Sequence, residues 1–207
     1  DTAVKRDSVT SHAKALGYLP SSSKSSNVYV DVTVTGVPTT QPTLVMDAGT
    51  IFTTSVNDVS YQFVTIGDHT ASSSTGTFVF EDVRIYEGTR IRYTYTADSS
   101  NLEQQFVIPS ATVDTSTIVV SVQASSSDIT TEVYTLNEDY ATLSSTSTKY
   151  FLQEIEDGRY EVYFGDGVSG KKPIDGNIVI LDYVVTNGST ADGAGAFTPA
   201  SSVGGYS

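Results

Sequence analysis

The sequence predicts a mainly β protein: an antiparallel, sandwich-like β domain with one N-terminal helix and a second, smaller subdomain rich in β-hairpins. Apolar and polar residues alternate from residue 27 onward, as at Val28, Val30, Val32 and Val34, which is the period of a half-buried strand. Short segments containing Gly, Pro or Asp separate such runs. Many short runs with regular turn signals are typical of an antiparallel sandwich and not of a parallel sheet with crossover helices.

Residues 1–26 are predicted to hold the one helix and a linker. Val9, Ala13 and Leu16 fall at i, i+4 and i+7, the spacing of one helix face. An Asp-Ser pair precedes them as a candidate N-cap, and a glycine follows them where a helix ends. The Ser- and Lys-rich residues 21–26 then indicate a flexible connection.

Residues 27–125 are predicted to form the larger β domain. After the first strand, further strands are expected at 50–54, 60–66, 77–86, 90–97, 104–108 and 117–123. The chain contains 13 Tyr and 8 Phe, so aromatic side chains supply much of the apolar bulk of a core.

Residues 126–188 are predicted to form the second β subdomain, with strands at 130–136, 149–156, 159–164 and 177–186. Asp157-Gly158 is the strongest short hairpin signal in the chain, because both residues tolerate positive φ. The boundary between the subdomains is expected near Ser126. Residues 189–207, rich in Gly, Ala and Ser, are expected to form a flexible tail that leads into the rest of a longer parent protein.

Composition excludes several classes of function. The formal charge of -13 repels a phosphate backbone, and no basic stripe interrupts it, so nucleic acid is not an expected partner. The chain has no cysteine, which excludes disulfides and thiolate metal sites. No apolar run approaches the roughly 20 residues that cross a bilayer, and the first residues do not have the pattern of a signal peptide. We therefore expect no membrane partner.

The segment from Gly165 to Lys171 has the glycine and lysine spacing of a phosphate-binding loop. That motif needs Ser or Thr after the lysine and a helix that begins there, whereas Lys172 and Pro173 follow here. We interpret the segment as a Gly-rich connection between two antiparallel strands. The expected structural turn residues, in the two turns together, are Gly165, Asp166, Gly167, Gly170, Asp157 and Gly158.

No other group of residues has the pattern of a catalytic, cofactor or metal site. His12 and His69 are the two histidines, and neither lies near another in sequence. Acidic residues gather around the two turns, at 156, 157, 166 and 175, but without the spacing of a calcium loop. The arginines at 84, 90 and 92 are expected to pair across strands with the acidic residues at 81, 82 and 87. We expect no enzyme activity and no cofactor.

The residues around the Gly-rich segment carry a resemblance to a known family. They read Tyr-Phe-Gly-Asp-Gly-Val-Ser-Gly-Lys-Lys at 163–172 and are followed by a second Asp-Gly turn and a strand that ends at Tyr183. This pattern resembles the signature hairpin of phage baseplate wedge proteins of the J-like family. The similarity extends to 151–159, and residues 6–18 resemble the helix that opens this region in the wedge subunit of T-even-like contractile-tail phages.

The resemblance implies a central to C-terminal fragment of a wedge subunit, a structural component of the virion. Such a subunit joins wedges around the tail hub and takes part in the rearrangement that accompanies sheath contraction. Its expected partners are other baseplate wedge and hub proteins, with self-association of the full-length parent. Its expected location is the tail baseplate, assembled in the host cytoplasm. The alternative is a secreted or surface β-sandwich module that binds carbohydrate or another ligand, with tyrosines in place of the absent tryptophan.

Overall fold

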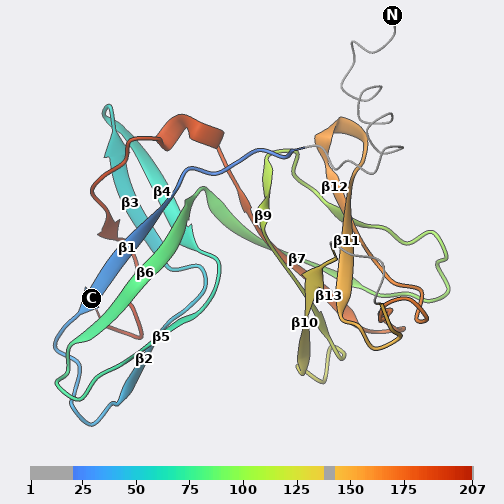
Figure 1. Ribbon diagram of the computed structural model, residues 1–207, viewed down its shortest axis with the longest axis horizontal. Helices are drawn as coiled ribbons and strands as arrows, with labels where there is room; N and C mark the ends of the chain where they lie inside the picture. Colours follow the sequence, from blue (N-terminus) through green and yellow to red (C-terminus); the bar gives the residue numbers. More distant parts are fainter. Residues whose placement is uncertain (1–20, 138–142, 207) are drawn as a thin grey trace, which may run out of the picture. The chain divides into compact units, whose positions relative to one another are not determined.

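The computed structural model describes residues 21–137 and 143–206, which fold mainly into β-strands (Figure 1). The strands are β1 (Asn27–Val34), β2 (Thr43–Met46), β3 (Ile51–Val56), β4 (Val59–Thr65), β5 (His69–Ser72), β6 (Phe78–Glu87), β7 (Thr89–Thr96), β8 (Phe106–Ile108), β9 (Val113–Gln123), β10 (Thr131–Leu136), β11 (Lys149–Glu154), β12 (Tyr160–Phe164), β13 (Ile178–Val185) and β14 (Thr198–Pro199). The mainly β prediction is confirmed, and every predicted strand is present. The structure adds β2, β5 and β14. The predicted N-terminal helix lies outside the described residues.

The chain divides into two compact units, and the division differs from the predicted boundary near Ser126. Unit 1 contains the described residues 21–22, 91–137 and 143–183, and unit 2 contains 23–90 and 184–206. No boundary falls near Ser126 because β9 and β10 pair across it in antiparallel register, with Gln123 opposite Thr131. The expected flexible tail instead belongs to unit 2, where β14 pairs with β3.

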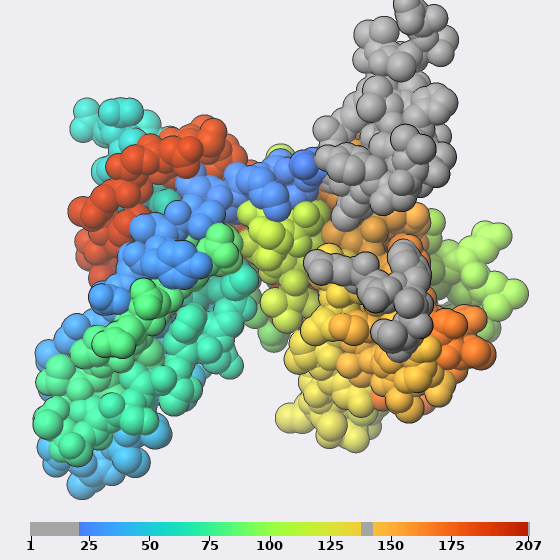
Figure 2. Space-filling model, in the orientation of Figure 1, coloured from blue at the N-terminus to red at the C-terminus, as the bar shows by residue number. Residues whose placement is uncertain are grey.

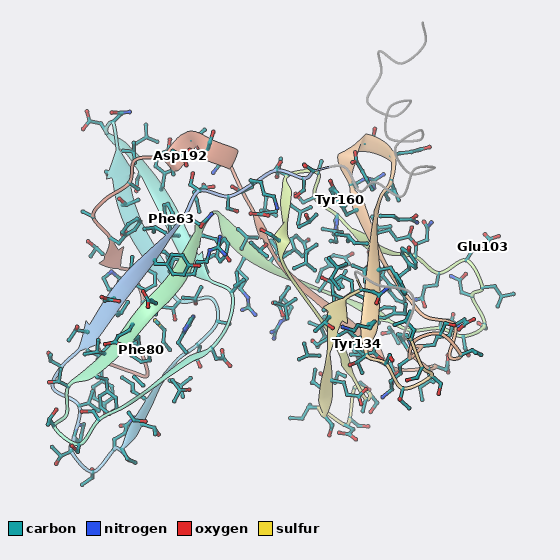
Figure 3. All side chains as sticks on the ribbon, in the orientation of Figure 1. Phe63, Phe80, Glu103, Tyr134, Tyr160 and Asp192 are labelled. Carbon is teal, nitrogen blue, oxygen red and sulfur yellow. The ribbon has the colours of Figure 1, made fainter. Side chains whose placement is uncertain are left out.

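Unit 2 contains a five-stranded sheet in the order β1-β6-β4-β3-β14 and a two-stranded sheet of β2 and β5. The large sheet follows the predicted alternation: in β1, Val32 and Val34 are buried and their neighbours are exposed. Side chains from both sheets meet in one buried cluster, which includes Phe63 of β4, Phe80 of β6 and Met46 of β2. Phe63 and Phe80 are labelled in Figure 3. A stacked sandwich remains a prediction.

Unit 1 contains a seven-stranded sheet in the order β7-β13-β9-β10-β11-β12-β8. Its interior is aromatic: the ring of Phe164 lies edge-on to the rings of Tyr134 and Phe106, with centroids 5.2 and 5.5 Å apart. Burial raises the pKa of Tyr134 and of Tyr150 to about 12. Tyr134 and Tyr160, which is 1% exposed, are labelled in Figure 3.

Two pairings in unit 1 correct the antiparallel hairpin prediction. β10 and β11 are parallel, with Thr135 opposite Lys149, whereas the pairs β9–β10, β11–β12 and β8–β12 of the same sheet are antiparallel. β12 lies between β11 and β8, whereas β13 lies between β7 and β9. The Gly-rich segment between β12 and β13 is therefore a crossover connection and not a hairpin turn, because the strands that it joins are not neighbours.

Candidate functional site

The glycine loop, residues 165–171, follows β12 in unit 1 and folds back on itself. Asp166 closes it, because its Oδ1 accepts hydrogen bonds from the backbone N–H groups of Val168 at 2.8 Å and Ser169 at 2.7 Å. The N–H of Gly167 donates to the carbonyl oxygen of Gly170 at 3.0 Å. The sequence interpretation, in which Asp166 caps its own turn, describes this arrangement.

The backbone amides of the glycine loop are already engaged. Besides the three N–H groups at 167–169, the N–H of Gly170 donates to the carbonyl of Ser144, and that of Lys171 to the carbonyl of Ser147, at 3.0 and 2.8 Å. A phosphate-binding loop needs such amides free and pointed at the anion. The carboxylate of Asp166 occupies the place that a phosphate would need, so a phosphate would have to displace it.

Each expected glycine has a definite backbone role in this loop. Gly167 and Gly170 have φ of 90° and 98°, which residues with a side chain rarely adopt. Gly165 has no positive φ, but a Cβ there would lie 2.3 Å from the carbonyl oxygen of Ser169 and 2.6 Å from two backbone atoms of Gly170. The loop therefore closes only because Gly165 lacks a side chain.

Charged side chains of both signs also lie at the glycine loop. Hydrogen bonds from the backbone of Ser169, and next from that of Val168, hold the pKa of Asp166 below its ordinary value, with a smaller contribution from the nearby Lys172 ammonium. Lys171 extends its ammonium to Glu132 of β10 in an ion pair. The lysine that a phosphate-binding loop would direct at its ligand thus binds a carboxylate instead.

Asp157 and Gly158 lie in the turn between β11 and β12, which pair in antiparallel register from Tyr150 to Glu154. Both turn residues have positive φ, 61° and 70°, the geometry of a tight hairpin turn that matches the strand twist. The carboxylate of Asp157 lies 3.8 Å from the guanidinium of Arg159, at an exposed site. The role of Asp157 and Gly158 is therefore to reverse the chain direction between β11 and β12.

A pocket of about 210 Å³ adjoins the glycine loop in unit 1. It is lined by the β7–β8 connection, by β12 and by the segment after the loop: Ala97, Asp98, Ser99, Asn101, Leu102, Gln104, Phe106, Glu161, Tyr163, Phe164, Gly165, Lys172 and Pro173. Figure 2 shows the β7–β8 connection, in light green, beside the orange surface of the later segment. Glu103 lies at the tip of that connection (Figure 3).

The structure does not bring the acidic turn residues together. Asp175 accepts a hydrogen bond from the backbone N–H of Ser99 at 3.1 Å, while Asp166 and Asp157 make the separate contacts given above. Within residues 21–137 and 143–206, no three His, Asp or Glu side chains are arranged to hold a metal ion. His69 lies in β5, and His12 lies outside the described residues.

The arginine pairings predicted from the sequence are wrong. Arg84 donates to Oδ1 of Asn27 and lies over the ring of Tyr86, with 5.0 Å to its centroid. Arg92 pairs with Asp182 at 2.9 Å. Arg90 donates to the carbonyl of Ala48 at 3.1 Å. The strand order decides such partners: Arg92 of β7 meets Asp182 because β7 lies beside β13. The spacing of residues along the sequence does not reveal this order.

Sequence reasoning missed that five carboxylates of the described residues are buried, among them Glu87 and Glu161. Glu87 accepts three hydrogen bonds in unit 2, from Oγ1 of Thr186 and from the backbone and side-chain nitrogens of Asn187, at 2.6, 3.0 and 2.8 Å. Glu161 lines the pocket of unit 1 and is 7% exposed. In an alternating strand, a glutamate between apolar residues indicates a solvent-facing position. The sequence pattern therefore did not predict that Glu161 is buried.

Comparison with known proteins adds one relationship. No family model matches the chain. The chain is 25% identical, over an alignment of 215 residues, to the "Baseplate wedge protein gp6" of Enterobacteria phage T4. The chain is similar to a phage baseplate wedge protein. The alignment covers 95% of this chain but 31% of the wedge protein, so the chain spans about a third of that relative's length. The similarity supports a wedge-like relationship and a place in the virion tail baseplate.

No helix among the described residues combines the length and apolar character needed to span a membrane.

A nucleotide titration tests the glycine loop directly. We expect magnesium-ATP at millimolar concentration to give no saturable heat in isothermal titration, because the amides at 167–171 and the Lys171 ammonium already have partners. Lys171→Gln serves as the control that separates binding at the loop from binding elsewhere. A dissociation constant below about 100 µM, worth over 5 kcal/mol, that Lys171→Gln abolishes would contradict this expectation.

Proposed function

We propose that the chain is a structural part of a phage tail baseplate, where it joins wedges around the tail hub and takes part in the rearrangement that accompanies sheath contraction. The observation that carries the proposal is the similarity to the T4 wedge protein, because it runs along 95% of the chain. In this proposal the chain is not an enzyme and acts by association with other wedge and hub proteins. The full-length parent also contacts copies of itself.

The strand arrangement offers surfaces for such association. Among the described strands, β1 pairs with β6 alone, so its outer edge is available to a strand of another chain. Large apolar side chains are also exposed in unit 1: Leu102, Val168 and Ile174 are 93%, 74% and 69% exposed. All three belong to the segments around the pocket or the glycine loop. Apolar side chains of this kind are common in the buried centre of interfaces.

Co-expression tests the proposal. We expect the full-length parent, produced together with its neighbouring wedge proteins, to form a complex that survives size-exclusion chromatography, because wedge assembly requires stable contacts. The parent produced alone is the control for self-association. The rival function, a surface module that binds carbohydrate, predicts the reverse: a parent that elutes alone and is retained on a glycan array. That result would overturn the assembly role.

A further inference from the structure

The pocket of unit 1 contains a buried carboxylate whose charge has no partner in the described chain. Glu161 is 7% exposed, and its one hydrogen bond there is from Nε2 of Gln153 to Oε2, at 2.8 Å. Gln153 lies directly opposite Glu161 on β11. An amide donor is neutral, so it does not balance the negative charge. A cation bound in the pocket would supply the missing counterion.

Two other buried carboxylates of the protein are satisfied within the chain. Asp182, 5% exposed, pairs with the guanidinium of Arg92 through contacts of 2.9 to 3.2 Å. Glu87, 1% exposed, accepts three hydrogen bonds. Glu161 has one donor and no cation, so its environment differs from theirs. Glu87 also lines a pocket, in unit 2, but three donors already hold its carboxylate there.

The rest of the lining favours a cationic side chain over a larger ligand. The pocket volume of about 210 Å³ is below the roughly 300–1,000 Å³ of sites for drug-sized ligands. The pocket lining also includes a second carboxylate, that of Asp98, and the aromatic rings of Phe106, Tyr163 and Phe164. A guanidinium is planar, stacks on aromatic rings and pairs with carboxylates through a fork of N–H donors. Lys172 is the one cationic residue of the lining. Its ammonium also interacts with Asp166 and helps to lower the pKa of that carboxyl.

We propose that this pocket receives the guanidinium of an arginine side chain presented by a partner protein, with Glu161 as its main counterion and Asp98 as the second. Arginine is among the residues most often found at the energetic centre of protein interfaces. The exposed Leu102, on the rim formed by the β7–β8 connection, supplies an apolar border. The source of the arginine, a neighbouring baseplate protein, rests on the proposed function, whereas the guanidinium chemistry rests on the pocket alone.

The test is a nuclear magnetic resonance titration of the isotope-labelled chain with acetyl-arginine amide. Acetyl-citrulline amide is the matched neutral probe, because citrulline has the same shape without the charge. We expect saturable shifts of the amide signals of Glu161, Tyr163 and Gly165 with a dissociation constant of about 1 to 10 mM, that is, about 3 to 4 kcal/mol. We expect citrulline to produce no saturable shift in that range.

Three variants locate the binding. Glu161→Gln should weaken arginine binding at least about fivefold, or about 1 kcal/mol, and leave the fold intact, because a glutamine oxygen still accepts the Gln153 hydrogen bond. Lys172→Gln removes the repelling cation and should tighten binding about twofold. Glu156→Gln removes one exposed carboxylate of the same unit that does not line the pocket, and should leave binding unchanged.

Several results would overturn the proposal. They are equal binding of citrulline, arginine binding that Glu161→Gln leaves unchanged, or saturable binding of acetyl-glutamate amide at the same signals, which would make Lys172 the recognition group. If Glu161→Gln does not fold, the effect of Lys172→Gln decides. A baseplate complex without arginine binding contradicts this inference alone. Arginine binding without any complex contradicts the proposed assembly function alone.

Discussion

Replacing Glu87 with alanine is expected to lower the free energy of unfolding of unit 2 by about 3 kcal/mol. The carboxylate is 1% exposed and holds the hydroxyl of Thr186 and two nitrogens of Asn187. Its removal leaves these donors without an acceptor, and a hydrogen bond to a charged group is worth about 1.5 to 3 kcal/mol. The same contacts tie the end of β6 to the residues after β13. Urea unfolding monitored by hydrogen exchange at the Asn187 amide measures the loss.

Two further variants make this expectation specific. Glu87→Gln keeps one oxygen acceptor and should lose less stability than Glu87→Ala. Glu81→Ala removes an exposed carboxylate from the same strand and should change stability by less than about 0.5 kcal/mol. An Asn187 amide that exchanges at the same rate in Glu87→Ala and in the unmodified protein would show that the buried carboxylate does not hold this segment.

Replacing Gly165 with alanine is expected to open the glycine loop and destabilise unit 1 by about 1 to 3 kcal/mol. The new Cβ would lie 2.3 Å from the carbonyl oxygen of Ser169, and no side-chain rotation can separate the two atoms, because the backbone sets the positions of both. The loop must therefore move, which breaks the hydrogen bonds from Val168 and Ser169 to Asp166. Because Gly165 also lines the pocket, we expect the variant to lose acetyl-arginine amide binding as well.

The measurements are urea unfolding and the titration of the Asp166 carboxyl by nuclear magnetic resonance. Opening the loop should raise the pKa of Asp166 toward its ordinary value, since the backbone donors that lower it are lost. Gly167→Ala is a graded control: its φ of 90° is strained for alanine, but no atom lies within 4 Å of the added Cβ, so the cost should be about 1 kcal/mol. Gly195→Ala, with open space and no positive φ, should be neutral. Equal unfolding of all three variants would contradict the steric explanation.

Local features of the glycine loop were readable from the sequence, but its place in the fold was not. Asp166 caps the loop, and Gly167 adopts positive φ, because these are properties of an Asp between glycines and depend on nearby atoms. The prediction that the loop is a hairpin between β12 and β13 was wrong, because three strands, β9, β10 and β11, lie between them in the sheet. The order of strands depends on long-range pairing, which local periodicity does not encode.

The sequence by itself determined where most strands lie, since a period of two reflects the pleat of a single strand. It did not reveal β2 and β5, which have four residues each, or β14, which has two and includes Pro199. Such short segments contain too few residues to show a period. Met46 of β2 is nevertheless fully buried, because the neighbouring sheet covers it.

The candidate site was decided by tertiary structure alone. Glu161 occupies a polar position of an alternating strand, which indicates solvent, yet it is buried in a pocket assembled from β12, the β7–β8 connection and the segment after the glycine loop. The division into units also depends on the tertiary structure, because each unit is made of segments that are far apart in the sequence. The physical reason is the same in both cases: burial and electrostatic partnership depend on which segments the folded chain brings together, whereas alternation and turn chemistry are properties of consecutive residues.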